Sequence, residues 1–159
     1  MTQQITQRFI KQNYSSRNGT PIYYIVIHDT GNTSKGADAY AHYRYFNSGY
    51  RAASAHYFVD DHSIIQTVDE RHSAWHVGDG KGRYHITNRN SIGVELCINS
   101  DGNIEKTKEN GLWLIRNLME KYNFSRHRVV RHWNASRKIC PRIFSGNEWH
   151  DWWDYWAQI

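Results

Sequence analysis

The stretch PIYYIVIH, residues 21–28, is β-branched and aromatic on both of its alternating faces and ends in a histidine. A run of this kind is typical of a central strand that is covered on both sides. We therefore predict a buried strand here, in the middle of a sheet. His28 shares one face of that strand with Tyr24 and Val26, and among such neighbours a functional site is the best explanation for a polar group.

The rest of the chain alternates between strand and helix patterns. Apolar spacing predicts a helix over 35–49, a hairpin over 54–68 that turns at Asp60–His62, a strand over 90–99, a helix over 105–124 and a short strand over 126–132. Trp149, Trp152, Trp153 and Trp156 occur at helical spacing, which predicts a buried helix face. We expect the N-terminal segment, 1–16, to be a loop with some helix.

These elements together predict one α/β domain over residues 1–159, with a central mixed sheet flanked by helices. The apolar fraction of 39% and the aromatic fraction of 14% exclude a disordered chain. No apolar run approaches the roughly 20 residues of a membrane span, so we expect no membrane partner. The first 16 residues lack the apolar core of a secretory signal. We therefore expect a cytoplasmic protein that reaches its target by cell lysis or another export route.

The net charge of +5 suits attraction to a polyanion, such as an anionic wall polymer. The lysines and arginines are scattered, with no run of five or more, which argues against nucleic acid as a partner. Two cysteines, Cys97 and Cys140, stand in different contexts and make no disulfide framework. We expect a monomer.

The stretch RHWNASRKICP, 131–141, holds His132 at the end of a predicted strand and Cys140 eight residues later. Together with His28 these side chains make a three-ligand set for one zinc ion, with a fourth position open to water. The competing interpretation is that Cys140 is a small buried apolar residue. No CxxC or HExxH motif decides between the two, and both stay open at this point.

Glu95 lies within the predicted strand 90–99, on the face opposite Ile92 and Val94. A carboxylate inside a sheet is unfavourable unless it is paired or catalytic, and Gly93 leaves space beside it. The alternative is an edge strand with a solvated face. Lys138 is either a cation near the same site or a solvated loop charge.

At this point the sequence resembles a known family. Four motifs occur in the family's order: YIVIHDTGN at 24–32, SAHYFVDDHSIIQTVDERHSAWHVGDGKG at 54–82, NSIGVELC at 90–97 and VVRHWNASRKICP at 129–141. They resemble the zinc-dependent N-acetylmuramoyl-L-alanine amidases of the amidase-2 type. This group includes phage endolysins and autolysins and is related to the peptidoglycan recognition proteins.

The resemblance implies one Zn²⁺ ion bound by His28, His132 and Cys140. It implies that Glu95 handles the catalytic water and that Lys138 stabilises the oxyanion. The implied substrate is bacterial peptidoglycan, cut between N-acetylmuramic acid and L-alanine, and the implied fold is a mixed sheet flanked by helices.

One position departs from part of the family. Some relatives carry a tyrosine before the histidine of the second motif and lack the glutamate of the third, whereas Ala55 precedes His56 here and Glu95 is present. The chain therefore resembles the glutamate-using branch, and we expect His56 to be a packed strand histidine. The glycine-rich segment 75–90 predicts a long functional loop beside the cleft.

That loop supplies Trp75, His76 and Asn90 as candidate substrate contacts, although Trp75 could instead cap the core. Three other functions compete with the zinc amidase. Cys140 could be the nucleophile of a cysteine hydrolase, but Pro141 directly after it fits a nucleophile at a helix start poorly. The chain could also be a non-catalytic peptidoglycan-binding module, which typically lacks the cysteine ligand, or, on charge alone, a nucleic-acid binder.

Overall fold

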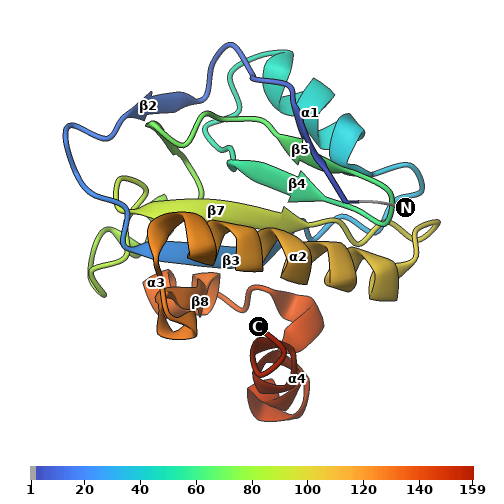
Figure 1. Cartoon of the computed structure of the whole chain (residues 1–159). Coiled ribbons are helices and arrows are strands. Elements are labelled where there is room, and N and C mark those ends of the chain that lie inside the picture. Colours follow the sequence, from blue (N-terminus) through green and yellow to red (C-terminus); the bar gives the residue numbers. More distant parts are fainter. Residues whose placement is uncertain (1–2) are drawn as a thin grey trace.

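The computed structural model describes residues 3–159, and its centre is a six-stranded sheet in the order β1-β5-β4-β7-β3-β8 (Figure 1). The strands are β1 (Ile5–Gln7), β3 (Tyr24–Asp29), β4 (Tyr57–Val59), β5 (Ile64–Gln66), β7 (Ser91–Leu96) and β8 (Val129–Arg131). The neighbours β4–β7, β7–β3 and β3–β8 are parallel, whereas β4 and β5 form an antiparallel hairpin. The predicted mixed central sheet is confirmed.

Around this sheet, the described part of the chain has four helices and three short 3₁₀ turns. The helices are α1 (Ala39–Asn47), α2 (Ile104–Tyr122), α3 (His132–Ser136) and α4 (Gly146–Trp156), and the turns are η1 (Gly78–Gly80), η2 (Arg126–Arg128) and η3 (Arg142–Phe144). The side chain of Asp38 accepts from the N–H of Ala41, so α1 begins later than the predicted helix. Helix α2 is capped in the same way by Asn103 and ends at Asn123 in a left-handed conformation.

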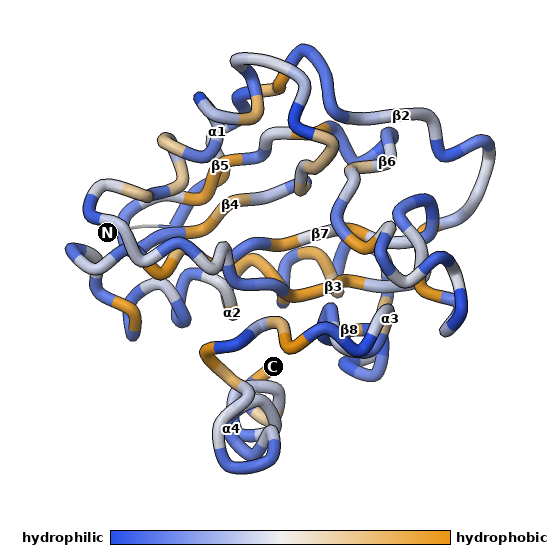
Figure 2. The backbone as a smooth tube through the Cα atoms, turned by 180° about the vertical axis from the view of Figure 1, so that it is seen from behind, coloured by the Kyte–Doolittle hydropathy of each residue, from blue (hydrophilic) through white to orange (hydrophobic). Residues whose placement is uncertain are grey.

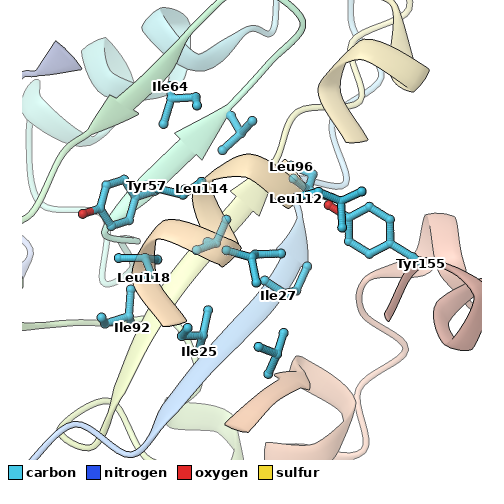
Figure 3. Close-up of a cluster of buried hydrophobic side chains, with 14 of the residues drawn as sticks. Ile25, Ile27, Tyr57, Ile64, Ile92, Leu96, Leu112, Leu114, Leu118 and Tyr155 are labelled. Carbon is cyan, nitrogen blue, oxygen red and sulfur yellow. The ribbon is translucent and has the colours of Figure 1, made fainter. Parts of the chain in front are cut away.

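The two faces of the sheet pack against different parts of the chain. Ile25, Ile27 and their neighbours on β7 pack against α2, which lies across β7 and β3 (Figures 1 and 3). Val26, on the opposite face of β3, packs against Val77 and Ala135 from the 75–90 loop and α3. The tube seen from behind is apolar along the central strands and hydrophilic in the connections (Figure 2). His28 lies on the second face, which is therefore the face that can hold a polar site.

His56 is the packed strand histidine that the sequence indicated. Its Nδ1 accepts from the N–H of Gly93 at 3.0 Å, and its Nε2 lies 2.8 Å from the carbonyl oxygen of His72. Because Nδ1 accepts, Nε2 carries the proton and donates. Burial lowers the pKa of His56 to about 4, so the ring is neutral at pH 7.

The predicted tryptophan face is partly wrong. Asn147, Glu148 and Trp149 have positive φ angles, so the regular helix begins only after Trp149. Trp152 is 1% exposed, but Trp153 is 47% exposed. Trp149 still packs against the core, so helical spacing overestimated the buried face at Trp153, which lies in the regular part of the helix.

Three tryptophans surround the guanidinium group of Arg131. Its guanidinium carbon lies 4.6 Å from the ring centres of Trp133 and Trp149 and 5.1 Å from that of Trp153. These cation–π contacts join the end of β8 to α4.

The expectation for the N-terminal segment is also wrong. β1 pairs in parallel with β5, and β2 (Tyr14–Ser16) pairs with β6 (His72–Ala74) in a small antiparallel sheet. Both N-terminal strands are exposed along their whole length, so the sequence shows no alternation of buried and exposed residues there. The two strands are defined by backbone pairing alone. Residues 1–2 of the segment lie outside the described residues. Within 3–159, no helix combines the length and the hydropathy needed to cross a membrane.

The packing of α4 on α2 gives a stability test. A Cβ on Gly111 would lie 2.6 Å from the hydroxyl oxygen of Tyr155 and 2.9 Å from Leu96 Cδ2. We predict that Gly111→Ala lowers the free energy of unfolding by about 1–3 kcal/mol, because overpacking outweighs the gain in helix propensity. In a Tyr155→Phe background the loss should shrink by at least about 0.5 kcal/mol, since the clashing oxygen is gone. Urea denaturation of the four proteins measures this, and equal losses in both backgrounds would contradict it.

Candidate metal centre

Strand register alone places three polar residues in a row. In the parallel ladder of β3 and β7, His28 pairs with Glu95. In the ladder of β3 and β8, Ile27 pairs with Arg131, so the next residues along are His28 and His132. Paired residues of parallel strands point to the same face. The carboxyl ends of the three strands therefore present Glu95, His28 and His132 side by side, where open α/β sheets place their sites.

His28, His132 and Cys140 converge at this edge, and all three are buried. The Nδ1 atoms of the two histidines are 3.0 Å apart, and Cys140 Sγ lies 3.7 Å from His28 Nδ1. Tetrahedral zinc with ordinary bond lengths holds two nitrogens about 3.4 Å apart, and a nitrogen and a sulfur about 3.6 Å apart. The donor set and its spacing therefore fit a zinc ion, and the structure brings together the three side chains that the sequence made candidate ligands.

The outer ring nitrogens of both histidines have partners. His132 Nε2 lies 2.8 Å from Asp79 Oδ1, and His28 Nε2 lies 2.9 Å from His76 Nδ1. Burial is the main cause that holds the pKa of both histidines below its ordinary value, strongly so for His28. The rings are therefore neutral at pH 7, which is the form that binds a metal.

Backbone contacts fix the loop that carries Cys140. The carboxylate of Asp29, the last residue of β3, accepts from the N–H of Ile143 at 2.9 Å. The N–H of Trp133 donates to the carbonyl of Cys140 at 3.1 Å. Burial raises the pKa of the Cys140 thiol, so without a cation beside it this sulfur stays protonated and a poor nucleophile.

Glu95 stands beside the ligand cluster. Its Oε1 is 3.9 Å from His28 Nδ1, and its Oε2 is buried without a hydrogen-bond partner in the described structure. Burial, reinforced by the charge of Asp29, raises the pKa of Glu95 to about 8. A buried and unpartnered carboxylate oxygen is costly in a folded protein, so its position points to a role in binding or catalysis.

A cavity of about 520 Å³ opens next to the cluster. Its lining includes His132 and Lys138 of the site and, from other elements, Tyr50, Ala52, Ala53, Trp75, His76, Gly78, Asp79 and Asn88. The rings of Trp75 and Tyr50 meet edge to face with centres 6.1 Å apart. Asn90 does not line this cavity, because its amide accepts from the N–H of Thr87 and donates to the carbonyl of His85. Of the three candidate substrate contacts, Trp75 and His76 reach the cavity.

Sequence reasoning missed Asp79. The residue lies in η1, and a Cβ on the next residue, Gly80, would lie 2.2 Å from the carbonyl oxygen of Ala135 in α3. This close approach brings the loop onto α3 and Asp79 to His132. The available signal was the spacing in WHVGD, 75–79, where a histidine and an aspartate stand three residues apart in one loop.

A second group of possible ligands, Asp38, Asp60 and His62, has a structural role instead. The Oδ1 atom of Asp60 accepts from the N–H groups of His62 and Ser63, and its Oδ2 accepts from the N–H of Ala39. The carboxylate thus closes the β4–β5 turn and joins it to α1.

Comparison with known proteins places this site in a family. Residues 18–143 match the family described as N-acetylmuramoyl-L-alanine amidase, Amidase_2. The amidase XlyA of Bacillus subtilis is 44% identical over 141 residues, which cover 87% of this chain and 46% of XlyA. The amidase CwlH of Bacillus subtilis is also 44% identical, over 119 residues that cover 75% of this chain and 47% of CwlH. The chain thus spans about half the length of these relatives.

Solved structures agree with the fold. The catalytic domain of XlyA superposes with a TM-score of 0.85 at 39% identity and covers 97% of both chains. The solution structure of the PlyG catalytic domain gives a TM-score of 0.82 at 28% identity, covering 98% of this chain and 92% of that one. On the family match and these identities, the chain belongs to the Amidase_2 family of N-acetylmuramoyl-L-alanine amidases.

Proposed function

We propose that this chain hydrolyses the amide bond between N-acetylmuramic acid and L-alanine in bacterial peptidoglycan, with one zinc ion held by His28, His132 and Cys140. The observation that carries the proposal is the convergence of these three ligands beside the unpartnered carboxylate oxygen of Glu95. Membership of an amidase family supports the choice of bond. When bound, the ion supplies Lewis-acid polarisation of water and of the substrate carbonyl.

Glu95 is the general base in this mechanism. Its free Oε2 takes a proton from the attacking water and later returns it to the leaving amine of L-alanine. A base must be ionised, whereas burial and the charge of Asp29 raise the pKa of Glu95 to about 8. A cation held by the neighbouring ligands favours the ionised carboxylate, so metal binding and base strength are coupled.

Lys138 stabilises the negative charge that develops on the carbonyl oxygen. Its side chain lines the cavity beside His132, and its positive charge lowers the pKa of both His28 and Glu95. A cation that faces the reacting atoms from a fixed loop lowers the barrier without moving during the reaction. Trp75, which also lines the cavity, is the aromatic surface on which a sugar ring would rest.

Two rival functions fit the site less well. A cysteine hydrolase needs a reactive thiolate, whereas Cys140 is 6% exposed and burial raises its pKa. A non-catalytic binding module needs no base, whereas Glu95 is held beside His28 with an unpartnered carboxylate oxygen. Both features favour a metal-dependent hydrolase.

Charge supports an anionic cell wall as the place of action. Residues 80–94 and 125–147 contain nine lysines and arginines and no aspartate or glutamate. These two segments adjoin in the fold, where the Arg137 guanidinium carbon lies 3.8 Å from the ring centre of Tyr84. A mainly positive surface beside the cleft attracts anionic wall polymers and increases the rate of encounter. We propose that the protein works there as a monomer.

The proposed bond and metal can be tested together by mass spectrometry of digested peptidoglycan. We predict intact glycan strands and peptides that begin with a free L-alanine amine. Product formation should stop with EDTA and return when zinc is added, because the ligands hold the ion reversibly. Cuts within the peptide, or digestion that survives the chelator, would contradict the proposal.

The role of Glu95 predicts a separation of metal binding from catalysis. Glu95→Gln should bind zinc with unchanged stoichiometry, while kcat falls by about 100- to 10,000-fold, as for loss of a general base. Glu70→Gln is the matched control: Glu70 is also buried, but Tyr57, Tyr122 and Lys121 bind its carboxylate away from the site. That control should lose stability and keep its kcat, whereas full activity of Glu95→Gln would remove Glu95 from the mechanism.

The two buried cysteines provide a matched pair for the metal. Cys140→Ser should lose zinc affinity by more than the about 10- to 100-fold that is typical of changes outside the ligand shell. Cys97, which packs with Phe58 and Ala55, has no ligand role, so Cys97→Ser should keep the zinc content of the wild type. Metal analysis after dialysis measures both, and unchanged zinc in Cys140→Ser would sink the ligand assignment.

A further inference from the structure

The side chains of His28, His76 and Ser91 form a continuous hydrogen-bonded row. His28 Nε2 lies 2.9 Å from His76 Nδ1, and His76 Nε2 lies 3.0 Å from Ser91 Oγ. The Ser91 hydroxyl in turn lies 2.5 Å from the carbonyl oxygen of Thr87. The row runs from the first residue of β7, through the 75–90 loop, to the end of β3.

The far end of the row fixes the direction of every hydrogen bond. A carbonyl oxygen can only accept, so the single hydroxyl proton of Ser91 goes to Thr87. Ser91 Oγ is then the acceptor for His76 Nε2–H. Within residues 3–159, no carboxylate is hydrogen-bonded to His76, so nothing favours a second proton on that ring. Its Nδ1 is therefore unprotonated, and its lone pair accepts a hydrogen bond from His28 Nε2–H.

The packing of the His76 ring against Gly93 is independent evidence that the structure fixes the position of this ring. A Cβ on Gly93 would lie 2.7 Å from His76 Cγ and 2.8 Å from His76 Nδ1. Only a residue without a side chain leaves room for the imidazole there. The amide oxygen of Asn88 accepts from the N–H groups of His76 and Val77, which anchors the backbone on the other side.

We propose that His76 is a positioning residue for the metal site: together with Ser91 it holds His28 in the Nε2–H tautomer and so directs the His28 Nδ1 lone pair at the zinc ion. This inference rests on the zinc site of the proposed function and assigns His76 a role other than substrate contact. Partners of this kind orient a ligand ring and raise its basicity.

The two histidine ligands are held by different chemistry. His132 donates to a carboxylate, Asp79, whereas His28 donates to a neutral imidazole. Residues 76 and 79 stand three positions apart in one loop, so a single loop orients both ligands. Because an imidazole fixes direction without adding a negative charge, the pair supports the zinc ion with one carboxylate rather than two.

The direction of the row can be read by NMR on the zinc-loaded wild-type protein. Long-range ¹H–¹⁵N correlation spectra distinguish the two neutral tautomers of each histidine. We expect His76 to carry its proton on Nε2 and to have a bare Nδ1. A proton on His76 Nδ1, with either a bare or a protonated Nε2, would reverse the bond to His28 and overturn the proposal.

Variants test whether the row matters for the metal. Zinc affinity, measured by competition with a chelator, should fall about 10- to 100-fold in His76→Leu. His76→Asn, whose amide oxygen can take the place of Nδ1, should recover most of that loss. Ser91→Ala should lose less than His76→Leu and should populate the second His76 tautomer in the NMR spectrum.

The matched control is Ser73→Ala, because Ser73 is equally buried in the adjacent strand β6 but its hydroxyl has no partner in the described structure. Its zinc affinity should equal that of the wild type. Equal affinity in His76→Leu, or equal losses in Ser91→Ala and Ser73→Ala, would overturn the proposal. A wild type that binds zinc but cleaves another bond would overturn the proposed function alone, and a wild type that binds no zinc would overturn both.

Discussion

In-register parallel pairing of β7, β3 and β8 is the constraint on which the site depends. It aligns Glu95 with His28 and brings His132 to the adjacent position, so the proposed base and two of the proposed ligands share one edge and one face of the sheet. A slip of one residue in either ladder would move a side chain to the α2 face, where the apolar core would exclude it. The large apolar cluster under α2 therefore stabilises the fold and also fixes the register of β7, β3 and β8, which brings the site residues together.

The opposite face carries the cost of this arrangement. Two histidine nitrogens that face each other at 3.0 Å, a thiol and an unpartnered carboxylate oxygen are unfavourable together in a dry site unless a cation joins them. The 75–90 loop and the loop after α3 supply the remaining partners, from Asp79, His76 and the backbone. These loops have no regular structure beyond the short 3₁₀ turns η1 and η3, so their backbone can follow the shape of the site.

The sequence was sufficient where one physical signal dominates. Continuous apolar character identified the central strands, and helical periodicity identified α2. Polar residues at strand ends made His28 and His132 candidates, and a carboxylate inside a strand made Glu95 one. It was insufficient where structure depends on pairing that leaves no side-chain pattern, as in β1 and β2. It was misleading at α4, where the regular tryptophan spacing continues onto an exposed position, Trp153. Asp79 was missed because, in the sequence, an aspartate that holds a candidate ligand looks the same as any other exposed loop aspartate.

The most direct test of this account is X-ray absorption at the zinc edge of the wild-type protein. We predict one sulfur at about 2.3 Å and three nitrogen or oxygen atoms at about 2.0–2.1 Å, with the multiple-scattering pattern of two imidazoles. Such a spectrum is the one that His28, His132, Cys140 and one oxygen ligand would give on a single ion. A shell without sulfur, or with two sulfurs, would contradict the claim that the register of three parallel strands builds this metal site.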